Sequence, residues 1–189
     1  GRLRQLDLVL ANPPYSIRQW DRAAFESDKY GRNFLGVPPQ GRADYAFLQH
    51  ILASMKEETG RCAILFHHGV LFRNEESAMR EKLVRSDRVE CVIGLAANLF
   101  YNSPMEACIM ICRMNKRPER RGQVLFINAV NEMERKNAQS YLEDRHIQKI
   151  SEAYHQYSDK AGFARVATIQ DIADHNFSLS IPLYVKEET

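Results

Sequence analysis

Leu6-Asp7-Leu8-Val9-Leu10-Ala11-Asn12-Pro13-Pro14-Tyr15 begins as an almost continuous apolar run and stops abruptly at two prolines. A short apolar run of this kind is typical of a strand buried in a parallel sheet. Pro13 and Pro14 end the strand because proline lacks a backbone N–H and fixes φ near −65°. In an open parallel sheet, ligands bind just beyond the carboxyl ends of the strands. The stretch therefore predicts an α/β sheet with a stiff loop placed for binding.

Four later apolar runs predict further strands, at residues 61–66, 89–95, 105–112 and 123–130. Helical periodicity between the first three strands implies parallel pairing, whereas the last three strands follow one another without a helix and imply an antiparallel edge. Beyond these strands, the pattern predicts helices over residues 147–157 and 169–173 and a half-buried strand over residues 177–181. We therefore predict one α/β domain covering residues 1–189.

The bulk composition is that of an ordinary globular domain, with 189 residues, 44% of them apolar and 26% charged. A net charge of +2 permits an acidic partner without requiring one. The four cysteines lie in apolar stretches without the spacing of a zinc or redox motif, so we expect core thiols and no metal. No signal peptide or run of about 20 apolar residues is present, which predicts a cytoplasmic protein and no membrane contact.

Asn12 and Pro13 offer two hydrogen-bond acceptors at the end of the first strand, an amide oxygen and a backbone carbonyl. An exocyclic amine can donate one hydrogen to each acceptor, which turns the nitrogen lone pair toward an electrophile. Tyr15 offers a ring on which a flat base could stack after leaving its duplex. We expect Asn12, Pro13, Pro14 and Tyr15 to be the catalytic residues, although the same string also suits a simple stiff turn.

Leu8 to Tyr15 resembles the catalytic motif of amino-methyltransferases that use S-adenosylmethionine. Later segments resemble the modification subunit of type I restriction-modification systems almost from end to end: residues 41–50, 60–73, 92–95, 98–101 and 124–129. The resemblance implies a Rossmann-like methyltransferase sheet and methyl transfer to the N6 amine of adenine in DNA. It also implies assembly with a specificity subunit, and with a restriction subunit in the complete system.

Two features depart from the family pattern. His67-His68 stands where the family usually has a proline and a variable polar residue; the two histidines could be site groups or merely polar residues that end a strand. The family's glycine-rich loop for S-adenosylmethionine has no counterpart here, because no two glycines lie two residues apart. We therefore expect the C-terminal, catalytic half of the methyltransferase sheet in a longer subunit, with weak or no cofactor binding by this chain.

Three further positions are candidates for binding. Asp44 and Phe47 could lie near the cofactor, or serve as a helix cap and a core aromatic. Trp20 could contact the substrate, because it belongs to a loop in which aromatic and basic residues alternate; that loop could equally fold against its own domain.

Two other functions remain open at this stage. The same motif could methylate a side-chain amide, as in a protein glutamine methyltransferase. The chain could also be a non-catalytic assembly module of a modification complex, in which an exposed edge strand provides the docking surface.

Overall fold

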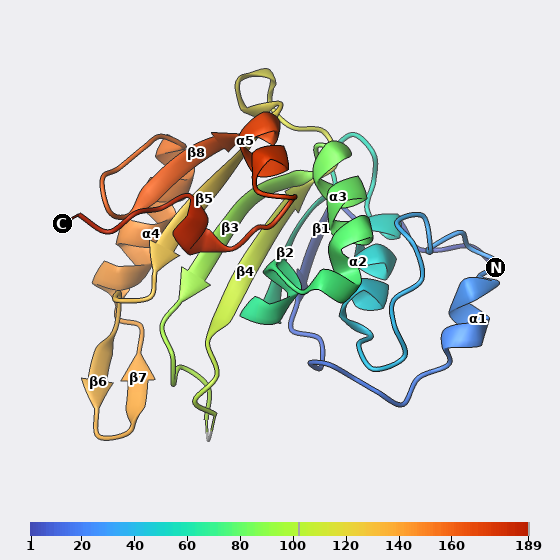
Figure 1. The fold of residues 1–189 in the computed structure, drawn as a ribbon, viewed down its shortest axis with the longest axis horizontal. Helices are drawn as coiled ribbons and strands as arrows, with labels where there is room; N and C mark the ends of the chain where they lie inside the picture. Colours follow the sequence, from blue (N-terminus) through green and yellow to red (C-terminus); the bar gives the residue numbers. More distant parts are fainter. Residues whose placement is uncertain (102, 189) are drawn as a thin grey trace.

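The computed structural model describes residues 1–101 and 103–188, which fold around a six-stranded sheet (Figure 1). In sheet order the strands are β1 (Leu8–Ala11), β2 (Arg61–His67), β4 (Ala107–Arg113), β3 (Val89–Leu95), β5 (Gln123–Ala129) and β8 (Ala164–Thr168). The α-helices are α1 (Arg22–Glu26), α2 (Asp44–Ala53), α3 (Ser77–Arg85), α4 (Asp144–Gln156) and α5 (Ile169–Asp174). The hairpin of β6 (Glu134–Lys136) and β7 (Gln139–Tyr141) projects from one end of the sheet.

The predicted α/β class is confirmed, because β1 pairs in parallel with β2 and β3 pairs in parallel with β5. β4 runs antiparallel to both β2 and β3, so those two strands point the same way. The carboxyl ends of all four parallel strands consequently lie at one edge of the sheet, the lower edge in Figure 1. The loop that follows β1 lies at that edge.

The antiparallel strands are placed differently from the simplest expectation. β4 lies inside the sheet between β2 and β3, and the antiparallel edge is formed by β8. β4 and β5 therefore do not form a hairpin, because β3 lies between them. Every residue of β3 is buried, as expected for a central strand that is covered on both faces.

Residues 177–181 do not form the predicted strand. Asn176 and Phe177 have φ values of 54° and 58°, which turn the chain away from an extended path. The N–H of Leu179 then bonds to the carbonyl of Leu71, and a short 3₁₀ helix, η4 (Ile181–Leu183), follows. The alternating apolar residues are buried under the sheet-covering helices rather than in a strand pair.

Helices cover the two faces of the sheet unequally. α2, α3 and α5 pack on one face, where the larger core cluster lies. α4 packs on the opposite face over β3 and β5, through Ala153 and the partly buried Ile150, Tyr154 and Tyr157. That face is not covered by a helix of the described residues over β1, where Leu8 is 50% and Leu10 is 74% exposed.

All four cysteines are buried and free, which confirms the prediction of core thiols. Within the described ranges, no helix combines the length and the apolar composition needed to cross a membrane.

The larger core depends on Phe126, which is fully buried and stacks on Tyr184 with ring centroids 4.1 Å apart. We predict that Phe126→Ala lowers the free energy of unfolding by about 3 to 5 kcal/mol, through lost burial and an unfilled cavity. Tyr101→Ala, at a side chain that is 88% exposed, should change it by less than about 0.5 kcal/mol. Urea titration followed by circular dichroism measures both, and equal effects would contradict this account of the core.

Candidate functional site

The loop after β1 lies beside the end of β2 because the two strands pair in parallel. Ala11 is in register with Ile64, so the chain leaves β1 three residues before β2 ends at His67. Asn12 and Pro14 are exposed, whereas Pro13 and Tyr15 are half-buried. The two expected acceptors thus lie at an accessible strand end.

Tyr15 is held by its ring rather than by its hydroxyl. The ring meets His67 edge to face, with centroids 5.7 Å apart and planes at 80°. Its buried hydroxyl has no hydrogen-bond partner among the described residues. Burial, with a smaller contribution from Cys108, raises the pKa of Tyr15 above its ordinary value, so the phenol stays neutral.

Ser16 fixes the far end of the loop in a left-handed conformation, with φ at 48°. Its backbone N–H donates to Asp44 Oδ1 at 3.0 Å. Its hydroxyl lies 3.0 Å from His67 Nε2 and accepts from Arg42 Nη1 at 3.2 Å. A non-glycine residue adopts this backbone conformation only where its surroundings enforce it, at a cost of order 1 kcal/mol.

Asp44 is the buried anchor of the loop, with a side chain that is 1% exposed. Besides the Ser16 N–H, it accepts from Arg73 Nη2 at 2.8 Å and lies 3.7 Å from His67 Nε2. Burial acts to raise the pKa of Asp44, but the nearby His67 imidazole and the hydrogen bonds from Ser16 and Arg73 outweigh it and lower the pKa to about 2. Asp44 is not the predicted helix cap, because the residue at the cap position of α2 is Ala43 and no side chain caps the helix. The carboxylate of Asp44 faces the loop instead.

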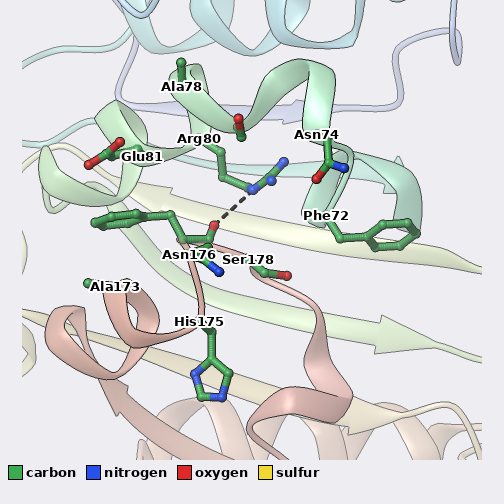
Figure 2. A pocket seen from close by; sticks show the side chains of 11 residues that line it. Phe72, Asn74, Ala78, Arg80, Glu81, Ala173, His175, Asn176 and Ser178 are labelled. Carbon is green, nitrogen blue, oxygen red and sulfur yellow. Dashed lines mark hydrogen bonds between the residues drawn. The ribbon is translucent and has the colours of Figure 1, made fainter.

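Arg73 connects this anchor to the rest of the core. Its Nε donates to Glu76 Oε1 at 2.6 Å, and burial raises the pKa of the Glu76 carboxyl. Arg80 in turn donates from Nη1 to the carbonyl of Arg73 and from Nε to the carbonyl of Phe177, each at 3.0 Å. Figure 2 shows Arg80 making the second of these bonds at the floor of a pocket between α3 and residues 173–178.

That pocket is structural support rather than the reaction centre. Its lining includes no residue of the loop after β1. Arg80 donates to the backbone carbonyls of Phe177 and Arg73, so its guanidinium holds the segment around Phe177 in place. A series of hydrogen bonds thus runs from Ser16 through Asp44 and Arg73 to Arg80. The bond drawn in Figure 2, from Arg80 to the carbonyl of Phe177, is the last of the series.

Trp20 and its neighbours contact groups of their own domain. The Trp20 indole N–H donates to the carbonyl of Gln40 at 2.9 Å, and its ring meets Phe25 at 5.9 Å. Tyr30 lies under the cations of Lys29 and Arg32. Phe47, in α2, is half-buried. Trp20, Tyr30 and Arg32 of this loop thus contact groups of their own domain.

Sequence reasoning missed Ser16, Arg42, Arg73 and Glu76 as parts of the site. Two signals in the sequence could have indicated them: Ser16 directly follows the loop motif, and Arg73 is a charged residue directly after an apolar segment. The sequence does not decide whether His67 and His68 are site residues. In the structure only His67 faces the loop, whereas His68 Nε2 lies 2.9 Å from the carbonyl of Ala107.

Ser16, His67 and Asp44 do not form a nucleophilic triad. In such a triad the serine and the carboxylate contact opposite nitrogens of the imidazole. Here both contact Nε2, while His67 Nδ1 accepts from the Gly69 N–H at 3.0 Å. The arrangement positions a loop and contains no activated hydroxyl.

A family model described as N-6 DNA methylase matches residues 2–189. The chain belongs to this family. The match confirms the resemblance that the loop motif and the later segments indicated.

This N-6 DNA methylase chain is similar to subunits of type I restriction enzymes. It is 35% identical over 185 residues to the MjaVIII methylase subunit of Methanocaldococcus jannaschii, covering 95% of this chain and 32% of that protein. It is 31% identical over 192 residues to the HindI methylase subunit of Haemophilus influenzae, covering 96% and 42%. The chain therefore spans less than half the length of these relatives.

Among solved structures, the chain is similar to the type I restriction-modification system methyltransferase subunit from Streptococcus thermophilus. The TM-score is 0.88 with 36% identity, over 96% of this chain and 38% of that one. The N-6 DNA methylase fold is thus shared over nearly all of the chain.

Ionised Asp44 should stabilise the fold, because its pKa is lowered from an ordinary 3.8 to about 2. A carboxyl with a lowered pKa contributes stability that is complete above its unfolded pKa and is lost as pH falls through its folded pKa. We predict that Asp44→Asn costs about 2 kcal/mol at pH 7, and that the difference shrinks between about pH 4 and pH 2.

Urea titrations at a series of pH values measure this difference. Glu58→Gln, at an exposed carboxyl, is the control and should stay within about 0.5 kcal/mol throughout. A cost for Asp44→Asn that did not depend on pH would show that the charge of Asp44 is not what holds the loop.

Proposed function

We propose that this chain is the catalytic part of an adenine-N6 DNA methyltransferase of the type I restriction-modification kind. The observation that carries the proposal is the accessible Asn12-Pro13-Pro14-Tyr15 loop at the carboxyl end of a parallel strand. The similarity to methylase subunits of type I restriction enzymes favours DNA over a protein amide as the acceptor.

The acceptor amine would bind between the Asn12 side-chain oxygen and the Pro13 carbonyl. Each accepts one N–H of the amine, so the lone pair faces away from the loop. The base would stack on Tyr15, whose ring is already held by His67. Partial positive charge that develops on the amine nitrogen during transfer is stabilised by the same two oxygens. The residues therefore act by positioning and by electrostatics, without a strong general base.

The residues of the chain fit the acceptor better than the donor. S-adenosylmethionine, when bound, supplies an electrophilic methyl group. Half-buried Phe47, in α2, would offer an apolar contact to the adenosyl group, while both oxygens of Asp44 already accept bonds within the chain. We propose that Asp44 would serve the cofactor side indirectly, through the loop that it holds.

The uncovered side of the sheet supports the proposal that a cofactor-binding half completes the enzyme. β1 is an edge strand, and the exposed Leu8 and Leu10 continue into partly exposed apolar residues on β2 and β4 of the same face: Ala63, Leu65, Ile109 and Ile111. An unpaired apolar edge invites association with another segment. We propose that the missing half of the methyltransferase sheet pairs with β1 and covers this face.

The proposed partners are DNA, a specificity subunit that selects the sequence to be methylated, and the restriction subunit of the complete system. The proposal for these partners rests on the similarity to type I methylase subunits.

Asn12 is the residue on which methyl transfer should depend most. We predict that Asn12→Ala in the intact enzyme lowers kcat about 100-fold, because one of the two amine acceptors is lost at the transition state. Asn115→Ala, at an exposed site after β4, whose carboxyl end lies at the opposite edge of the sheet, should leave kcat within about twofold. The measurement is transfer of labelled methyl from S-adenosylmethionine to duplex DNA, with a protein substrate assayed in parallel.

Near-normal transfer by Asn12→Ala would refute the proposed role of the loop. Labelling of protein rather than DNA would favour the glutamine methyltransferase alternative. For the isolated chain, calorimetry should detect weak or no binding of S-adenosylmethionine, and micromolar affinity would contradict a separate cofactor half.

Leu8 and Leu10 should behave differently in the isolated chain and in the intact enzyme. We predict that the double substitution L8K/L10K reduces self-association of the isolated chain, because lysine on an edge strand opposes pairing. In the intact enzyme the same change should reduce thermal stability, because it would place charge in a covered interface. Sedimentation velocity and thermal melting measure the two effects, with Tyr141→Lys on the β6–β7 hairpin as the control. Unchanged stability of the intact enzyme would show that this face is not covered.

A further inference from the structure

We propose that His67 is a positioning residue for methyl transfer, which holds Ser16 through its Nε2 atom and sets the ring of Tyr15 through its own ring. The proposal deepens the proposed function and rests on it, because the loop is taken to bind the acceptor amine. It gives a role to the histidine that stands at the end of β2.

The contacts of His67 divide between its two ring nitrogens. Nδ1 accepts from the Gly69 N–H at 3.0 Å and thereby caps the short 3₁₀ helix η1 (His68–Leu71). Nε2 faces the opposite way, 3.0 Å from Ser16 Oγ and 3.1 Å from Arg73 Nη1. One nitrogen therefore supports the local backbone and the other supports the catalytic loop.

The close fit on the Nδ1 side fixes the direction of the ring. A Cβ atom at Gly69 would lie 2.6 Å from His67 Cε1, so only glycine allows the ring to lie flat against this turn. The side chain of His67 is only 14% exposed. Nε2 is therefore aimed at the loop by packing, and it does not need Ser16 to hold it there.

The loop, in contrast, needs His67. Ser16 is held in a left-handed conformation by three contacts. Its N–H donates to Asp44 and its hydroxyl accepts from Arg42, which belong to one segment. Only the contact of the hydroxyl with His67 comes from another segment. Without the His67 contact, the hydroxyl keeps only the longer bond from Arg42. Ser16 can then relax, and the Asn12 and Pro13 oxygens move relative to the base. A displacement of about 1 Å in a reacting group can cost about 100-fold in rate.

His68 provides a matched control in the next position. Its Nε2 lies 2.9 Å from the carbonyl of Ala107 on β4, so its side chain points to the sheet and away from Tyr15 and Ser16. Substitution of His68 removes a half-buried histidine from the same strand end without touching the loop.

The test uses the intact enzyme with His67→Ala, His67→Gln, His67→Asn and His68→Ala. The amide nitrogen of glutamine can replace Nε2, whereas the side chain of asparagine reaches only the position of Nδ1. We expect His67→Ala to lower kcat at least about 10-fold, with the KM for DNA within about twofold, because the loop is misplaced rather than lost. His67→Gln should recover several-fold more activity than His67→Asn, and His68→Ala should keep kcat within about twofold.

Three results would overturn the proposal: normal kcat in His67→Ala, recovery by His67→Asn that equals recovery by His67→Gln, or an equal loss in His68→Ala. The second result would mean that His67 acts only as the cap of η1.

Ser16→Ala removes the same contact from the loop side, which covers the case in which the His67 variants do not fold. Its kcat should fall similarly, and the double substitution with His67→Ala should cost no more than either change alone. Additive losses would refute the contact between the two side chains.

Hydrogen exchange separates this proposal from the proposed function. The Ser16 amide donates to Asp44, so its exchange rate reports the loop conformation without methyl transfer. We expect His67→Ala to accelerate this exchange and His67→Gln to restore protection, even if the parent enzyme methylated another acceptor. Wild-type protection in His67→Ala would refute the positioning role, whereas an absence of DNA methylation in the wild type would refute only the proposed function.

Discussion

The ion pair between Asp44 and Arg73 is the interaction on which the described site depends. Asp44 begins α2, Arg73 follows η1, and the backbone of Ser16 closes onto Asp44 from the loop. Burying two charges is expensive unless the remaining lone pairs and donors are satisfied. Here Ser16, His67 and Glu76 provide those partners, so the cost of burial is offset only when all of these segments are in place. The loop, the helix and the strand end therefore order one another.

The site separates the groups that act from the groups that hold them. The two proposed acceptor oxygens, on Asn12 and Pro13, are neutral and accessible, which suits a reaction that develops partial charge on a neutral amine. The charged residues lie behind the loop, in the buried layer between α2 and α3. The carboxylate of Asp44, behind the loop, accepts from the Ser16 N–H and so restricts where the acceptors lie.

The sequence predicted the parts of the fold that depend on local pattern. The run before Asn12 formed a strand, the apolar stripe of residues 147–157 formed α4, and residues 169–173 formed most of α5. The place of β4 could not be predicted, because strand order depends on which faces are covered and not on the pattern within one strand. The tail from Phe177 alternates like a strand, but two left-handed residues redirect it.

The candidate site shows the same limit. Neighbouring residues of a strand point to opposite sides, so His67 and His68 were bound to differ, but only the pairing of β1 with β2 decides which one meets the loop. The charged partners could not be found from spacing, because Asp44 and Arg73, which form the ion pair, lie 29 residues apart in the chain. The alternating aromatic and basic residues of the loop that contains Trp20 suggest a nucleic-acid surface. In the structure, however, the cations of Lys29 and Arg32 lie over the ring of Tyr30 in the same loop.

The single tryptophan of the chain lies in the segment that follows the loop after β1. The indole N–H of Trp20 donates to the carbonyl of Gln40, and its ring packs edge to face against Phe25. Its fluorescence therefore comes from one place only, eight residues after the proposed base-binding asparagine. Emission wavelength and quenching would follow the ordering of this segment in real time, without a label, whenever a nucleic acid or another polypeptide segment binds.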